Sequence, residues 1–244
     1  FDYSAIRPEG ALIKGFGGTS SGYGPLKELH DSLTELYTAK VGEPITSVDI
    51  VDTENLIGRC VVAGNVRRSA ALAMGAYNDR QYLEMKNDQE KLYHHRWGSN
   101  NSFNAIVGMD YTWHAEQSQK NGEPGYIWLD NARTRGRFKD GPRFDDINVA
   151  GFNPCVEQQL EDAELCCLVE TYPAKIAYLY GKTITLSNTH WPETNAKMLK
   201  NRRIGLSQSG VVQAFNKHGK REMLNWCDNA YDYVRELDQE YSNW

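Results

Sequence analysis

The stretch FNPCVEQQLEDAELCCLVETYP, residues 152–173, gathers three of the five cysteines of this 244-residue chain. Pro154 stands directly before Cys155, and a proline fixes its own φ and drives the preceding residue towards an extended conformation. Residues 153–155 are therefore expected to form a turn and not a helix. The pattern predicts a thiol held at a turn tip by stiff backbone, flanked by Asn153 and Glu157.

The predicted turn collects three groups that can do chemistry together. They are a sulfur, an amide that can bind hydroxyl groups and a carboxylate that can move protons. After the turn, residues 165–171 alternate as a buried strand does, so Cys166 and Cys167 should point to opposite faces and only one can share a cavity with Cys155. Free cysteines are also among the most buried residue types. From the residues alone, a redox or nucleophilic thiol site and simple packing are equally good explanations.

The composition narrows the function classes. With 27 basic and 32 acidic residues the net charge is -5, so no net positive field draws the chain to nucleic acid or to an anionic membrane. No apolar run approaches the roughly 20 residues of a membrane span, and no signal peptide is recognisable at the first residues. The odd number of irregularly spaced cysteines fits a reducing compartment. We expect a cytoplasmic protein that binds neither nucleic acid nor membrane.

Helical and strand-like stretches alternate along the chain without repeats, which favours one α/β domain. The glycine-rich stretch 15–24 is expected to be a loop, followed by a helix from Pro25. Further helices are expected over 47–62, 78–95, 112–122 and the C-terminal residues, and strands over 102–109 and 126–130, while 65–75 fits either state. The last helix is expected to have one apolar face, which comprises Leu224, Cys227, Tyr231, Val234 and Tyr241.

Other motifs carry weaker signals. The glycine-rich loop could cradle a phosphate before a helix, but no Lys-Ser or Lys-Thr pair follows, so a connecting loop is the preferred interpretation. The pairs Arg67–Arg68 and Arg202–Arg203 are typical of surface ion pairs. No histidine or cysteine pair has the spacing of zinc ligands, so we expect no metal site.

The cysteine-rich stretch resembles the active-site segment of the monomeric, adenosylcobalamin-dependent (class II) ribonucleotide reductases, which usually reduce ribonucleoside triphosphates. Five other stretches resemble that family in the same order: IRPEGALIKGFGGTSSGYGPL (6–26), VVAGNVRRSAALAMG (61–75), NGEPGYIWLDNARTRGR (121–137), THWPETN (189–195) and NRRIGLSQSG (201–210). The resemblance covers essentially the whole chain. It implies that residues 1–244 are the central part of a single catalytic α/β barrel domain, with the N- and C-terminal portions of the family missing.

The resemblance implies a role for each residue of the turn. Cys155 would carry a thiyl radical and take the 3'-hydrogen of the substrate ribose. Glu157 would act as general base on the 3'-hydroxyl, and Asn153 would hydrogen-bond the ribose. Cys166, eleven residues after Cys155, would be half of the dithiol that reduces the sugar, which leaves Cys167 as a structural residue.

The family's fold, a ten-stranded α/β barrel with a central finger loop, is implied in the same way. The expected cofactor is adenosylcobalamin, and the expected partners are a ribonucleotide substrate, a deoxynucleotide effector and a thioredoxin-like reductant. The expected state is a monomer. The stretch containing Ser4, Ile6, Arg7 and Gly10 matches the loop that relays effector identity to the substrate base.

Some positions depart from the family. Val156 stands where glycine is frequent, and no cysteine matches the partner of Cys166, because the surroundings of Cys60 differ and suggest a core residue. We therefore expect the chain alone to be inactive in repeated turnover. Two alternatives stay open: a non-catalytic, nucleotide-binding piece of such a reductase, or a hydrolase with Cys155 as nucleophile and a base such as His190.

Overall fold

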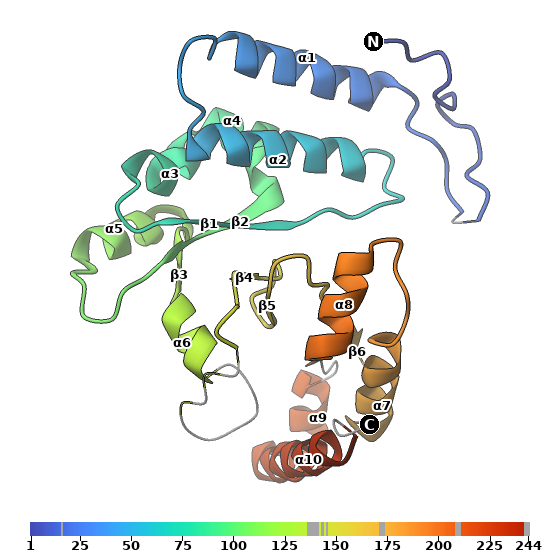
Figure 1. Ribbon diagram of the computed structural model, residues 1–244, viewed down its shortest axis with the longest axis vertical. Helices are drawn as coiled ribbons and strands as arrows, with labels where there is room; N and C mark the ends of the chain where they lie inside the picture. The colour runs from blue at the N-terminus through green and yellow to red at the C-terminus, as the bar shows by residue number, and fades with distance from the viewer. Residues whose placement is uncertain are drawn as a thin grey trace. The chain divides into compact units, whose positions relative to one another are not determined.

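A computed structural model describes residues 1–15, 17–135, 142, 144, 146–170, 174–207 and 211–241. The chain divides into two compact units, Phe1–Leu129 and Asp130–Trp244. Each unit contains both helices and strands (Figure 1). No helix in the described ranges is long and apolar enough to cross a membrane.

The first unit begins with the glycine-rich loop and two helices, α1 (Gly24–Thr38) and α2 (Ser47–Val62). The loop prediction is confirmed for its described residues, whose only regular pairing is an isolated antiparallel bridge between Leu12 and Thr19. Helix α2 has the predicted bounds, because Thr46 and Asp49 form a reciprocal capping box at its start. In Figure 1, α2 lies between α1 and the strands β1 and β2.

A three-stranded parallel sheet follows, in the order β1-β2-β3. The strands are β1 (Ala71–Ala76), β2 (Ser99–Asn104) and β3 (Gly125–Ile127). The crossovers that parallel strands require contain α3 (Arg80–Glu84), η1 (Met85–Asn87), α4 (Gln89–His94) and η2 (Arg96–Gly98) in one case, and α5 (Thr112–Asn121) in the other. The ambiguous stretch 65–75 is thus a strand from Ala71 onward, and α5 ends as predicted at Gly122, which is left-handed.

The prediction of one solvated helix over 78–95 is wrong. Asp79 and Asp88 each accept a hydrogen bond from the backbone at a new helix start, so the stretch breaks into α3, η1 and α4. The apolar side chains of α3 are also buried, since Tyr82 and Leu83 pack with Phe103 of β2 in the core of the first unit. The predicted strands differ as well: β2 begins at Ser99 and ends at Asn104, and β3 ends at Ile127, before helix α6.

A buried ion pair lies beside this core. Arg96 donates to both carboxylate oxygens of Asp52, at 2.6 and 2.7 Å, and to the carbonyl of Met85. His95 Nε2 lies 2.9 Å from the same carboxylate. Burial alone would raise the pKa of Asp52, but the hydrogen bonds from Arg96 and His95 outweigh it and lower the pKa to about 2.

A run of side chains connects this ion pair to the surface. His95 Nδ1 lies 3.0 Å from His94 Nδ1, and His94 Nε2 lies 2.6 Å from a terminal nitrogen of Arg59. The other terminal nitrogen of Arg59 donates to Glu28 at 2.6 Å. The run joins α4 to α2 and α1.

The second unit contains a hairpin, a small parallel sheet and four helices in its described parts after α6 (Leu129–Arg135), which begins at the end of the first unit. Strands β4 (Gly151–Phe152) and β5 (Gln159–Leu160) pair antiparallel, and β6 (Leu168–Glu170) pairs parallel with β7 (Gly205–Ser207). The helices are α7 (Ala174–Ile184), α8 (Pro192–Asn201), α9 (Val211–His218) and α10 (Lys220–Tyr241).

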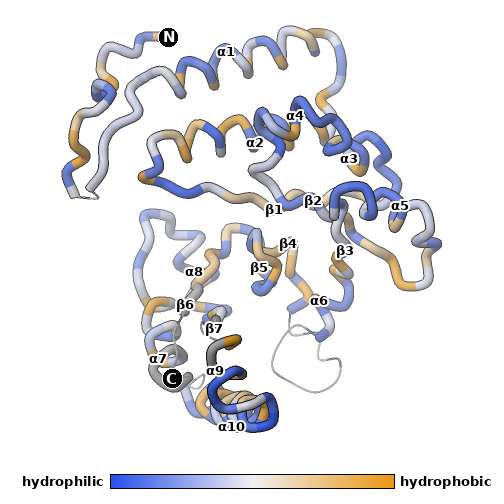
Figure 2. Tube along the Cα trace, turned by 180° about the vertical axis from the view of Figure 1, so that it is seen from behind, coloured by the Kyte–Doolittle hydropathy of each residue, from blue (hydrophilic) through white to orange (hydrophobic). Residues whose placement is uncertain are grey.

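Helix α10 buries only part of the predicted apolar face. Val234 is buried and Tyr241 packs against the same core cluster, as predicted. Leu224 and Tyr231, however, are both 47% exposed, and Met223 and Leu237 are buried instead. Figure 2 shows hydrophobic and hydrophilic residues interleaved along this helix. Because α10 packs on α7, where Tyr178 lies in the same core cluster, that contact decides which apolar residues are covered.

Candidate active site

Residues 153–158 form the loop that connects β4 to β5, and Cys155 lies within it. The backbone closes the loop twice: the Asn153 N–H donates to the Gln158 carbonyl at 3.1 Å, and the Val156 N–H donates to the Asn153 carbonyl at 2.9 Å. Val156 has a φ of 67°, a left-handed conformation that β-branched residues rarely adopt. This explains physically why glycine suits the position, and it confirms the predicted turn.

Asn153 is the centre of the loop's side-chain contacts. It is 4% exposed, and its Oδ1 accepts from the Gln158 N–H at 2.9 Å. Its Nδ2 donates to the Glu157 carboxylate and to Cys166 Sγ, the latter at 3.3 Å. The structure thus brings Cys166, from the segment after β5, to Asn153 and Glu157 in the loop that contains Cys155.

The two thiols after the loop differ in exposure. Cys166 is exposed and Cys167 is buried, which agrees with the predicted alternation, although both precede β6 and lie outside the strand. Burial raises the pKa of the Cys166 thiol, the hydrogen bond from Asn153 lowers it, and the charges of Glu157 and Cys155 raise it, with a net upward shift. A raised pKa keeps the S–H bond at neutral pH, which suits hydrogen-atom chemistry better than attack by a thiolate.

Gln158 ties the loop to the cysteine pair. It is 4% exposed, and its Nε2 donates to the Cys167 carbonyl at 3.0 Å. The neighbouring acidic residues are tied to α8: Glu161 accepts from Lys197 at 2.8 Å and from Lys200 at 3.0 Å. Burial alone would raise the pKa of Glu161, but these hydrogen bonds lower it to about 2.

The interpretation of Arg203 as part of a surface pair is wrong. Its side chain is 8% exposed and pairs with Glu164 and Asp146, because the turn after α8 faces the segment that leads to Cys166. Sequence reasoning did not single out Gln158, Glu161 or Glu164, and it did not assign Arg203 to the site. The available signal was the acidic run at 161–164, opposite in charge to the basic run at 197–203.

The predicted effector loop lies in the first unit. Ser4 N–H donates to Asp2 at 2.9 Å, and Ile6 N–H donates to the Tyr3 carbonyl at 3.0 Å. The carbonyl of Arg7 accepts from Ser20 Oγ at 3.0 Å, and Gly10, with a φ of 77°, donates its N–H to the Ser20 carbonyl. All four predicted residues are exposed.

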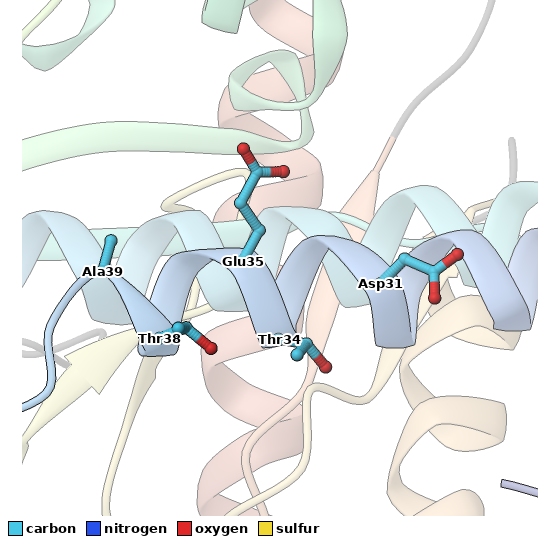
Figure 3. A pocket seen from close by; sticks show the side chains of 5 residues that line it. All are labelled: Asp31, Thr34, Glu35, Thr38 and Ala39. Carbon is cyan, nitrogen blue, oxygen red and sulfur yellow. The ribbon is translucent and has the colours of Figure 1, made fainter.

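Two hollows lie elsewhere in the first unit. One, of about 530 Å³, is a shallow surface over a single helix, α1, lined by Asp31, Thr34, Glu35, Thr38 and Ala39 (Figure 3). The other, of about 250 Å³, lies between α1 and α2. Cys60, predicted as a core residue, lies in its wall and is only partly buried.

The hydrolase alternative needs a base beside Cys155. Among the residues that the structure describes, no histidine hydrogen-bonds the Cys155 sulfur, and the contact recorded for His190 is with the ring of Trp191. The loop therefore offers Cys155 a carboxylate and an amide as neighbours, and no imidazole.

Comparison with known proteins identifies the family. No family model matches the chain. It is 46% identical to a probable adenosylcobalamin-dependent ribonucleoside-triphosphate reductase of Dictyostelium discoideum, over 100% of this chain and 34% of the relative. It is 45% identical to the adenosylcobalamin-dependent ribonucleoside-triphosphate reductase of Euglena gracilis, over 100% of this chain and 35% of the relative. The chain thus spans about a third of the length of the curated relatives it matches.

A solved structure gives the same result for the fold. The crystal structure of a B-12 dependent (class II) ribonucleotide reductase matches 97% of this chain and 38% of its own, with a TM-score of 0.83 and 36% identity. This match confirms the predicted α/β fold class, as part of a class II reductase. By sequence and by fold, the chain belongs to the family of adenosylcobalamin-dependent, class II ribonucleotide reductases.

Proposed function

We propose that this chain carries the radical thiol and one of the two reducing thiols of an enzyme that converts ribonucleotides to 2'-deoxyribonucleotides for DNA synthesis. The observation that supports this most directly is that Asn153, in the loop of Cys155, contacts both Glu157 of the same loop and Cys166 of the segment that follows β5. An amide, a carboxylate and two thiols gathered at one loop meet the needs of hydrogen-atom transfer, proton transfer and reduction on one sugar.

Adenosylcobalamin is the proposed cofactor, and one feature of the loop fits it. Cys155 is exposed, so its S–H hydrogen can be reached by a group bound outside the loop. When bound, this cofactor supplies radical initiation through homolysis of its cobalt–carbon bond. The part of Cys155 is to present its sulfur on a constrained turn, where the loss of a hydrogen atom leaves a thiyl radical.

The sugar chemistry then divides among the loop residues. The Cys155 thiyl takes the 3'-hydrogen atom, so that a C–H bond breaks and an S–H bond forms. Glu157 accepts the proton of the 3'-hydroxyl, and Asn153 exchanges one of its present hydrogen bonds for the ribose. The 2'-hydroxyl leaves as water with a proton from one of the reducing thiols, Glu157 returns its proton to the 3'-oxygen, and Cys155 finally returns a hydrogen atom to the 3'-carbon.

The two electrons for this reduction come from a pair of thiols. Cys166 is one of them, and together the pair gives up two electrons and two protons and becomes a disulfide. Buried Cys167 takes no part in the reduction. Because burial also raises the pKa of Cys167, its thiol stays protonated and unreactive.

The remaining assignments follow the family. The proposed substrates are ribonucleoside triphosphates, the proposed regulator is a deoxynucleotide effector read by Ser4, Ile6, Arg7 and Gly10, and the proposed reductant of the disulfide is thioredoxin-like. We further propose a cytoplasmic monomer in which both units belong to a single catalytic α/β barrel domain.

Exchange of hydrogen between solvent and the 5'-carbon of adenosylcobalamin, measured with nucleotide present, tests the radical step. The expected result is exchange that depends on nucleotide and is abolished by Cys155→Ala. Cys167→Ala is the matched control, since it removes a neighbouring thiol and should leave exchange intact. The measurement should use the complete reading frame that contains this chain.

Other outcomes identify the alternatives. Nucleotide binding without exchange supports the non-catalytic, nucleotide-binding piece. Full exchange in Cys155→Ala contradicts the radical role of Cys155. Hydrolytic activity that is lost in both Cys155→Ala and His190→Ala supports the hydrolase.

A further inference from the structure

One guanidinium group contacts both segments that frame the thiol loop. Arg203 Nε donates to the two oxygens of Glu164 at 3.0 and 2.9 Å, and a terminal nitrogen lies 3.0 Å from Asp146 Oδ1. All three side chains are buried, with exposures of 8% for Arg203, 1% for Glu164 and 2% for Asp146. The arginine is therefore a bridge between two buried carboxylates.

The two carboxylates lie on either side of the loop in the sequence. Asp146 lies before β4, and so on the entry side of the loop that carries Cys155. Glu164 lies two residues before Cys166, on the exit side. Arg203 thus links the two segments whose separation determines how far apart the two thiols are.

The segment on the exit side of the loop is also bound by α8. The Glu161 N–H donates to Glu164 at 2.8 Å, and Glu161 itself binds Lys197 and Lys200 of α8. Arg203 directly follows Arg202, the left-handed residue that ends this helix. Residues at the end of α8 and directly after it therefore bind the segment that leads to Cys166 and hold it in place.

The geometry requires an arginine. Two carboxylates on different sides of the bridge need separate N–H donors in a rigid, planar arrangement. A lysine has a single ammonium group on a flexible stem, and it cannot satisfy both carboxylates in the same directions. The substitution Arg203→Lys keeps the charge and removes the bridge.

We propose that Arg203 is a positioning residue for the Cys166 thiol, which sets the separation between the Cys155 loop and the Cys166 segment. Its effect on thiol geometry stands by itself, and only its effect on turnover rests on the proposed function. Arg203 acts through Glu164 and Asp146 and does not touch the substrate.

The test is a comparison of Arg203→Lys with Arg59→Lys in the complete protein. The control is the same replacement, at an arginine that pairs with Glu28 in the first unit. Dibromobimane, which bridges two nearby thiols, is the probe, and mass spectrometry measures the yield of the Cys155–Cys166 product. The expected result is a several-fold lower yield in Arg203→Lys and an unchanged yield in Arg59→Lys.

Two further measurements separate positioning from general damage. Iodoacetamide should alkylate Cys166 several-fold faster in Arg203→Lys, because the freed segment leaves the Asn153 hydrogen bond. In turnover, kcat should fall while KM for the nucleotide stays unchanged. Circular dichroism checks that the variant is folded.

The proposal is overturned if folded Arg203→Lys gives the wild-type cross-link yield and alkylation rate. If Arg203→Lys does not fold, Glu164→Gln decides, since it keeps a hydrogen-bond acceptor and loses the charge. A lower cross-link yield there supports the bridge, and an unchanged yield overturns it. These thiol measurements need no catalysis, so they remain decisive even where the hydrogen-exchange test of the radical step fails.

Discussion

Arg96 in the first unit and Arg203 in the second are both buried and both bind carboxylates, yet they do so in different ways. Arg96 donates from Nε and one terminal nitrogen to a single carboxylate, that of Asp52, and from its other terminal nitrogen to the Met85 carbonyl. Arg203 donates from Nε to Glu164 and forms an ion pair with Asp146 through a terminal nitrogen, and these two carboxylates belong to different segments. An arginine that binds one buried carboxylate stabilises the core around it. An arginine that binds two carboxylates from different segments also determines how far apart those segments lie.

The difference extends to the surroundings. Asp52 is also bound by His95, in a core where Gly75 leaves room for Tyr82, because an added Cβ would lie 2.2 Å from the ring. The thiol loop contains the left-handed Val156 and exposed Cys155 and Glu157. Tight packing excludes alternative arrangements in the first region, while the second leaves its reactive groups accessible.

The largest expected effect is that of Arg96→Met. This change leaves Asp52 buried without its main partner, and breaking a buried pair in this way costs about 3–5 kcal/mol. Urea unfolding followed by circular dichroism measures the loss. Arg59→Met, at an arginine whose side chain is 31% exposed, is the matched control and should lose far less. If Arg96→Met lowers the free energy of unfolding by less than about 1 kcal/mol, Arg96 does not stabilise the core and the difference drawn between it and Arg203 is wrong.

Acid should weaken the same ion pair. The pKa of Asp52 is lowered from 3.8 to about 2 in the folded protein, so its contribution is complete above 3.8 and is lost as the pH falls through 2. A shift of this size corresponds to roughly 2 kcal/mol. Unfolding free energies at several pH values should fall through this window, and Asp52→Asn should remove that part of the fall. An unchanged pH dependence in Asp52→Asn would contradict the assignment.

The smallest expected effect is that of Val156→Gly in the thiol loop. Glycine accepts a φ of 67° without the cost of about 1–2 kcal/mol that other residues bear there, but it loses more freedom on folding. The two terms nearly cancel, so the free energy of unfolding should change by less than about 1 kcal/mol. Thermal unfolding measures it, with Val149→Gly, at a fully buried valine, as the destabilising control. A large loss in Val156→Gly would mean that the Val156 side chain itself stabilises the loop.

A region could be predicted from the sequence where the residues that determine its structure are close together in the chain. The bounds of α2, the end of α5 at Gly122 and the turn at Pro154 were correctly predicted, because a capping box, a left-handed glycine and a proline act within a few residues. The break in residues 78–95 had local signals too, in Asp79 and Asp88, but the charged composition concealed them.

The buried charges could not be predicted in the same way. Arg96 and Arg203 look like surface arginines in the sequence, and their burial depends on partners 44 and 39 residues away. The buried face of α10 depends likewise on its contact with α7. The thiol loop was accessible to sequence reasoning because its residues are neighbours in the chain, whereas the structure that holds it comes from distant segments.

The run of side chains from Glu28 to Asp52 has a direction. Arg59 can only donate, so His94 Nε2 must accept, and the hydrogen of His94 then resides on Nδ1 and points to His95. His95 in turn donates from Nε2 to Asp52, so from Arg59 to Asp52 the hydrogens all point toward the buried carboxylate. Burial, Arg59 and His95 lower the pKa of His94 below 6.5, so the stability that this order provides is complete above 6.5 and declines below it. A proton added to His94 would put a hydrogen on Nε2, opposite the N–H of Arg59, and the hydrogen bond that joins α4 to α2 would be lost.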